Sequence, residues 1–95
     1  MTTKLQADFN GLFGDVLCLS HDESAKDVTG EQITLTSGMP VLAFESDPDH
    51  DGNPAFLVAR GRAEISPDEL LCRGSRWCLH IDDQGVRHVA SLDDA

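Results

Sequence analysis

The chain has 95 residues, of which 17 are acidic and 7 are basic, and its formal net charge is −10. A surface with this balance repels the phosphates of nucleic acids and of anionic membranes, so neither is an expected partner. The length suits one small domain over residues 1–95, and we expect residues 1–8 and 91–95 to be flexible. Excess acid also keeps a small protein soluble, so we expect a monomer or a weak homodimer.

The cysteines indicate a reducing compartment. Cys18, Cys72 and Cys78 form an odd set whose spacing matches neither a disulfide framework nor a CxxC redox pair. The amino-terminal residues lack the apolar stretch of a secretory signal. We therefore expect free thiols and a cytoplasmic location.

Two segments in the first half of the chain have the patterns of strands. Residues 15–20 carry Leu17 and Leu19 on one face and further apolar residues on the other, so this strand is expected to be central. Residues 31–36 alternate apolar and polar side chains, which is typical of a half-buried strand. Residues 21–30 between them are polar and end in a Thr-Gly turn signal, which predicts a loop.

A long β-hairpin is predicted over residues 39–65. Two apolar arms flank residues 46–54, which are rich in the aspartate, glycine and proline of tight turns. Gly61 stands in the middle of the second arm, where glycine usually marks a bulge that bends the strand. We expect the other strands to pack around this curved hairpin.

Residues 67–72 are predicted to form one short helix. Ser66 can cap it, Pro67 fits its first position, and Glu69 completes a capping box. Gly74 then supplies a left-handed stop. A helix this short is marginal alone, so it needs packing against the strands.

Residues 75–82 and 86–90 are predicted to pair as a second hairpin. The connection between them suits a type I turn followed by Gly85 in the left-handed region. In that register His80 lies opposite His88.

The expected fold is therefore mainly β, a small and strongly curved barrel or β-roll of about five or six antiparallel strands with one short helix. The order of elements resembles SH3-like barrels in layout, and no residue motif supports membership of a family. An open β-sandwich is the alternative architecture.

The tip of the first hairpin begins like a calcium loop. Asp47, Asp49 and Asp51 stand at its first, third and fifth positions, followed by glycine. The twelfth position of such a loop needs a bidentate carboxylate, and here it is Val58. The preferred interpretation is a solvated turn in which the aspartates bond their own backbone, with a cation site as the alternative.

Cys72, Cys78, His80 and His88 offer the sulfur and ring nitrogen atoms that zinc prefers, and the predicted register brings the two histidines together with Cys78 beside them. Their spacing matches no tight zinc knuckle. Buried thiols and exposed histidines are therefore the preferred interpretation. No cofactor is expected, and zinc or calcium are the alternatives.

Arg60 and Arg62 are two residues apart in a predicted strand, which places both side chains on one face. They either receive an anionic ligand or peptide, or they pair with neighbouring acidic side chains. No nucleophile elbow, phosphate loop or metalloprotease helix occurs in the sequence, so catalysis is not expected.

The expected function is that of a non-enzymatic protein-interaction or accessory module, whose acidic surface favours a basic protein partner. The alternatives are a small ligand- or metal-binding regulatory domain and an acidic inhibitor of a basic protein.

Overall fold

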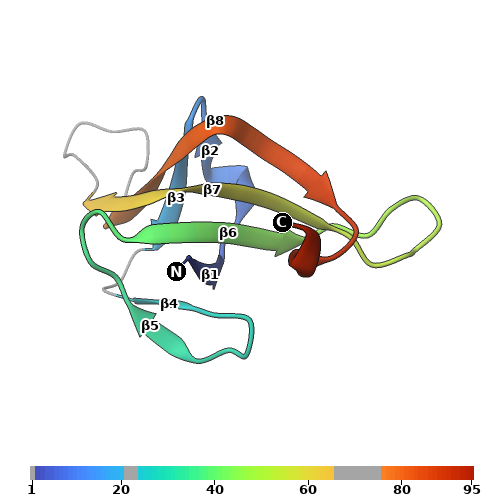
Figure 1. Cartoon of the computed structure of the whole chain (residues 1–95), viewed down its shortest axis with the longest axis horizontal. Helices are drawn as coiled ribbons and strands as arrows, with labels where there is room; N and C mark the ends of the chain where they lie inside the picture. The colour runs from blue at the N-terminus through green and yellow to red at the C-terminus, as the bar shows by residue number, and fades with distance from the viewer. Residues whose placement is uncertain (1, 21–23, 66–75) are drawn as a thin grey trace.

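The structure, a computed structural model, describes residues 2–20, 24–65 and 76–95. Strands make up most of these residues, which confirms the mainly β fold (Figure 1). The elements in chain order are β1 (Thr3–Gln6), η1 (Phe9–Gly11), β2 (Leu12–Phe13), β3 (Val16–Ser20), β4 (Ser24–Lys26), β5 (Gln32–Thr34), β6 (Pro40–Ser46), β7 (Phe56–Ile65), β8 (Trp77–Val89) and η2 (Leu92–Asp94). The helix expected over residues 67–72 lies outside the described residues.

The described strands form one six-stranded sheet, in the order β1-β6-β7-β8-β3-β2, and a separate two-stranded sheet of β4 and β5. The large sheet is strongly curled (Figure 1). Neighbouring strands within this sheet are antiparallel, except that β1 and β6 run parallel. The prediction of an all-antiparallel sheet is therefore wrong. A parallel pair needs a long connection, and here the chain passes through β2, β3, β4 and β5 before it returns.

Strand β1 occupies residues that we expected to be unattached. Leu5 is fully buried and lies opposite Ala43 of β6. One apolar side chain among polar neighbours carries little periodic signal, so this strand depends on a partner far along the chain.

The predicted central hairpin is confirmed as β6 and β7, which pair from Pro40 opposite Arg62 to Ser46 opposite Phe56. The register between β7 and β8 shifts beside Gly61, but the bulge lies on β8 and not in β7 as expected. Between the pairs Ala59–Val86 and Gly61–Ile81, one residue of β7 faces residues 82–85 of β8. The bulge increases the local twist and so helps the sheet to curl.

The second predicted hairpin is wrong, because residues 77–89 form one continuous strand, β8. Ile81 pairs with Gly61 and Val86 pairs with Ala59, so both sides of the expected turn lie along the same neighbour, β7. The local turn expected before Val86 nevertheless forms, because Gln84 N donates to Asp82 Oδ1 at 3.0 Å and Gly85 has the left-handed φ of +65°. A local turn of this kind makes either a reversal or an outward bulge, and pairing with β7 selects the bulge.

The two smaller strands also differ from expectation. The expected loop over residues 21–30 contains β4, and β5 pairs with β4 instead of joining the central hairpin. The Thr-Gly turn lies between them, where Asp27 Oδ1 accepts from the backbone N–H groups of Thr29 and Glu31. The hydrogen bond that the Thr29 hydroxyl donates to Asp27 Oδ1, together with these two backbone bonds, lowers the pKa of Asp27.

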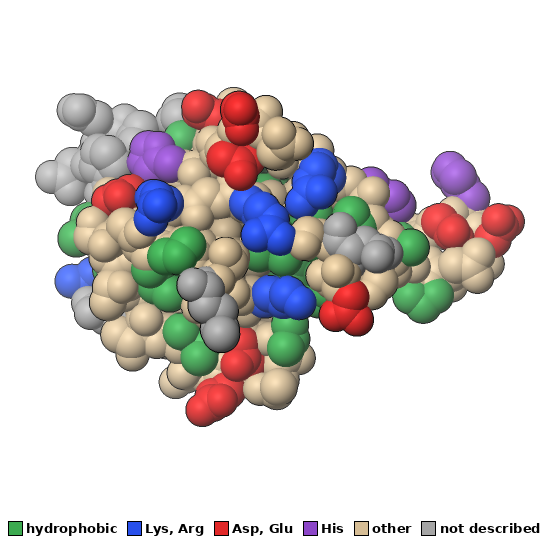
Figure 2. Space-filling view, in the orientation of Figure 1, with side chains coloured by type: hydrophobic (Ala, Val, Ile, Leu, Met, Phe, Trp, Pro, Cys, Tyr) green, Lys and Arg blue, Asp and Glu red, His purple; other side chains and the backbone are tan. Residues whose placement is uncertain are grey.

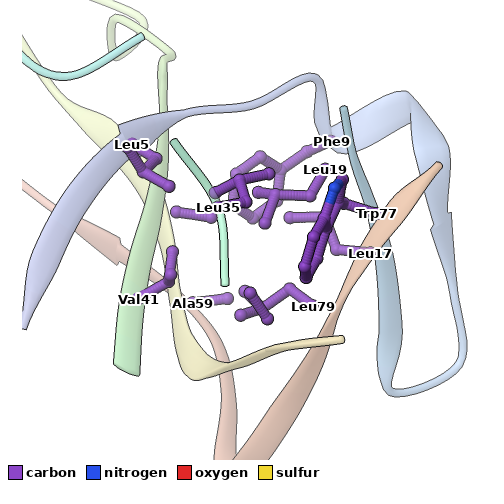
Figure 3. Packing of buried hydrophobic residues seen from close by; sticks show 11 residues of the cluster. Leu5, Phe9, Leu17, Leu19, Leu35, Val41, Ala59, Trp77 and Leu79 are labelled. Atoms are coloured by element: carbon purple, nitrogen blue, oxygen red, sulfur yellow. The ribbon is translucent and has the colours of Figure 1, made fainter. Parts of the chain in front are cut away.

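The concave face of the curled sheet holds the main core (Figure 3). The alternation expected in residues 15–20 is confirmed, since Leu17 and Leu19 are buried here. The fully packed members of this core are Leu5, Phe9, Leu17, Leu19, Leu35, Val41, Ala43, Ala59, Ala63, Trp77 and Leu79.

The opposite, outer face of the sheet carries a second apolar cluster of Leu42, Phe44 and Val58. Leu92 and Ala95 pack against this cluster, and η2 begins where the Ser91 side chain accepts from Asp93 N. Residues 91–95, which we expected to be flexible, are therefore seated on the sheet. No helix in the described part of the chain has the length and apolar character needed to cross a bilayer.

Candidate functional site

The outer face of the sheet brings together cations from three strands, β1, β7 and β8. Side chains alternate along a strand, so Arg60 and Arg62 of β7 both point away from the main core, as expected from their spacing. Arg62 lies directly opposite His80 of β8. Arg60 lies opposite Leu42 of β6, which in turn lies opposite Lys4 of β1.

Arg87 of β8 completes this group, because it lies opposite Val58, a member of the outer apolar cluster. We call Lys4, Arg60, Arg62 and Arg87 the basic strip. The described residues include six Lys and Arg side chains, so most of the described positive charge lies on this face. Figure 2 shows several Lys and Arg side chains on the face seen in this view, with acidic side chains around them.

Two pockets adjoin the basic strip and share Arg60 and Thr2. The first has a volume of about 690 Å³, which is within the range of ligand sites. It is lined by Thr2, Pro40, Val41, Arg60, Gly61, Arg62, Glu64, His80 and Asp82. The second has a volume of about 350 Å³ and is lined by Thr2, Lys4, Leu42, Arg60, Leu92, Asp93 and Ala95.

Both arginines of the first pocket bond backbone oxygens. Arg62 Nη1 donates to Gly38 O at 2.8 Å, and Arg60 Nη2 donates to Ala95 O. Within the described residues, no Asp or Glu carboxylate is within ion-pair distance of any member of the basic strip. A guanidinium has five N–H donors, so each arginine keeps donors that it can direct at a ligand.

The carboxylates of the first pocket are engaged with other groups. Glu64 Oε2 accepts from the Ser37 hydroxyl at 2.7 Å, and Asp82 Oδ1 accepts from Gln84 N. The pairing of arginines with neighbouring acids, which was one of the two expectations, is therefore not found among the described residues.

The acidic tip does not gather its three aspartates around one point. Asp49 Oδ1 accepts from the backbone N–H groups of Asp51 and Asn53, each at 2.9 Å. These hydrogen bonds, that from Asn53 N first, lower the pKa of Asp49. Asp47 instead turns to His88, with Oδ2 3.4 Å from Nε2. This is the arrangement of a turn that bonds its own backbone, and the described residues contain no group of three or more metal-ligating side chains.

The cysteines and histidines considered as zinc ligands do not come together either, because the predicted strand register that placed His80 opposite His88 is wrong. His80 lies opposite Arg62 and His88 lies opposite Leu57, so the two histidines are spread along one strand. Cys78 lies opposite Glu64 and is buried. Cys72 lies outside the described residues.

The expectation of free thiols is wrong at Cys18, which is disulfide-bonded. Cys78, by contrast, is buried and takes part in no disulfide, as expected. Disulfides are rare in reducing compartments, so the cytoplasmic location remains a prediction that has lost its support from the thiols.

Three contributors to the site carry no local sequence signal. Lys4 joins it through the parallel pairing of β1, Arg87 through the continuous β8, and Leu92 through the docking of η2. Each depends on contacts between distant segments. The signal that could be read locally was the i, i+2 spacing of the two arginines.

Planar guanidinium groups bind carboxylates and phosphates through two parallel hydrogen bonds, so the chemistry of this face is that of oxyanion recognition. No protein family, curated protein or solved structure matches this chain. Function therefore has to follow from the chemistry of the basic strip and its two pockets.

Proposed function

We propose that this protein is a non-enzymatic interaction module that binds an acidic segment of a protein partner on the outer face of β6, β7 and β8. One observation carries the proposal. Arg60 and Arg62 line a single pocket and, among the described residues, meet no Asp or Glu carboxylate, although the chain carries 17 acidic side chains. Arginines left available in so acidic a protein favour a ligand that supplies the missing anion.

A peptide suits the site better than a free anion. The basic strip crosses four strands, and the apolar cluster of Leu42, Phe44 and Val58 lies next to it. A segment with several carboxylates can reach more than one of these cations at once. Its binding must also overcome repulsion from the net charge of −10, so local contacts rather than long-range steering would hold it.

The SH3-like layout expected from the order of elements belongs to the same proposal, since SH3 domains present an open groove to an extended peptide. Their grooves are lined by aromatic rings that hold proline. Here Arg60, Arg62 and His80 line the first pocket, so a proline-rich ligand is not favoured.

A basic protein partner, or a basic protein that this chain inhibits, is the second candidate. The net charge of −10 and the projecting tip with Asp47, Asp49 and Asp51 favour it (Figure 1). Such a partner would bind the acidic periphery and leave the basic strip free. The two candidates therefore predict opposite peptide preferences.

Fluorescence anisotropy with labelled hexaglutamate and hexalysine peptides tests the proposal. Hexaglutamate should bind, and the double variant Arg60→Glu/Arg62→Glu should weaken binding by about tenfold or more, because two attractive contacts become repulsive. Lys26→Glu is the matched control, since Lys26 is exposed on β4 in the small sheet, and it should leave binding unchanged. Binding of hexalysine alone would support the second candidate. Equal losses in both variants would overturn the role of the outer face.

A further inference from the structure

The chain's own residues 92–95 already occupy one end of the outer face. Leu92 and Ala95 pack against the apolar cluster of Leu42, Phe44 and Val58. These two residues extend the cluster beyond the sheet and cover apolar surface that the strands leave on this side. The apolar end of the proposed binding surface is therefore filled by a segment of the same chain.

The same segment also reaches the basic strip. Asp93 lines the smaller pocket together with Lys4 and Arg60. Arg60 Nη2 donates to the backbone oxygen of Ala95. A single short segment thus combines a leucine on the apolar cluster with an acidic side chain and a backbone acceptor beside the cations.

We infer that the partner's acidic segment has this chemistry, a leucine followed by acidic residues, and that it binds by displacing residues 92–95. The inference rests on the proposed function and adds the class of ligand and the competition within the chain. Displacement frees Arg60 from Ala95, so that Arg60 and Arg62 together hold the carboxylates of the incoming segment. The leucine of that segment takes the position of Leu92.

The short element that must leave is suited to this exchange. Helix η2 has three residues, and a 3₁₀ turn of that length has few hydrogen bonds of its own. Leu92 is half-buried, whereas Leu42 and Val58 beneath it are buried. Such peripheral segments open with small free energies while the sheet stays folded. The fraction of molecules in which the segment has left the face then limits the apparent affinity for the partner.

Binding of two labelled, amidated peptides tests the inference. One has the sequence SLDDA of residues 91–95, and the other has serine in place of its leucine. We expect the leucine peptide to bind more tightly to wild-type protein. The variant Leu92→Ser loosens the competing segment, so the leucine peptide should bind this variant about tenfold more tightly than wild type. Equal affinity of the two peptides, or of the two proteins for the leucine peptide, would overturn the inference.

A measurement on wild-type protein guards against misfolding of the variant. In NMR spectra, an excess of the leucine peptide should shift the signals of Leu92 and Ala95 towards those of a released segment, together with the signals of Leu42 and Arg60. Shifts around Arg62 without release of Leu92 would overturn the displacement and leave the proposed function standing. If hexaglutamate binding does not depend on Arg60 and Arg62, the proposed function fails, whatever the leucine dependence.

Discussion

A Cβ atom placed on Gly61 would lie 2.0 Å from the carbonyl oxygen of His80. Gly61 pairs with Ile81 next to the bulge of β8, and here the backbones of β7 and β8 approach closely where the larger pocket begins. Only glycine leaves room for this approach. The curvature of the sheet and the position of His80 beside Arg62 therefore depend on one missing side chain.

Gly61→Ala should accordingly lower the free energy of unfolding by about 3 kcal/mol, the upper end of the cost of overpacking, because backbone atoms must move. Urea denaturation measures the change. Gly52→Ala is the matched control: Gly52 has φ +83° and nothing within 4 Å of its added Cβ, so it should cost only about 1 kcal/mol of left-handed strain. Equal losses for both variants would contradict the steric account.

Leu79 is fully buried on the concave face, opposite Leu17 of β3 and Ala63 of β7. Leu79→Ala should therefore lower the free energy of unfolding by about 2–5 kcal/mol, through lost burial and the cavity that remains. The control is Val28→Ala, since Val28 is 52% exposed and should change stability by no more than about 0.5 kcal/mol. A loss at Leu79 as small as the control would mean that the curled sheet does not enclose this core.

The pKa of Asp49 lies below its ordinary value of 3.8, chiefly because its carboxylate accepts the backbone N–H of Asn53. A carboxyl whose pKa is lower in the folded state stabilises the protein at pH values above its unfolded pKa. That contribution is lost as the pH falls through the folded pKa. The stability difference between wild type and Asp49→Ala should therefore be constant at neutral pH and shrink below pH 3.8. Denaturant titrations at several pH values measure it, and a difference independent of pH would contradict the hydrogen-bonded turn.

Cys18 and Cys78 lie opposite each other on β3 and β8 and differ in chemical state, since Cys18 is disulfide-bonded and Cys78 is in no disulfide. Only a thiolate reacts with an alkylating agent. In denaturant without reductant, iodoacetamide should therefore modify Cys78 and leave Cys18 unmodified, and prior reduction should expose both. Peptide mass spectrometry distinguishes these outcomes. Modification of Cys18 before reduction would show that the thiols are free, as first expected, and would restore the argument for a reducing compartment.

Several features of the fold can be read locally, because neighbours along the chain generate them. The alternation of Leu17 and Leu19 predicts the buried face of β3, and the apolar arms around the acidic tip predict the pairing of β6 with β7. Gly61 predicts where the pairing of β7 becomes irregular, although the bulge itself lies on β8, and the spacing of Arg60 and Arg62 predicts their common face. In each case the signal is a side-chain period or a backbone preference within a few residues.

Other features depend on segments that are distant in the sequence. Thr3–Gln6 becomes a strand through β6, and the turn at Asp82–Gly85 becomes a bulge through β7. Arg60 and Arg62 meet no Asp or Glu carboxylate among the described residues, because folding engages Glu64 and Asp82 elsewhere and lays residues 92–95 across the outer face. Local patterns state which residues form strands and turns. The pairing of those strands, and the groups left available on their outer face, follow from long-range packing that no local pattern contains.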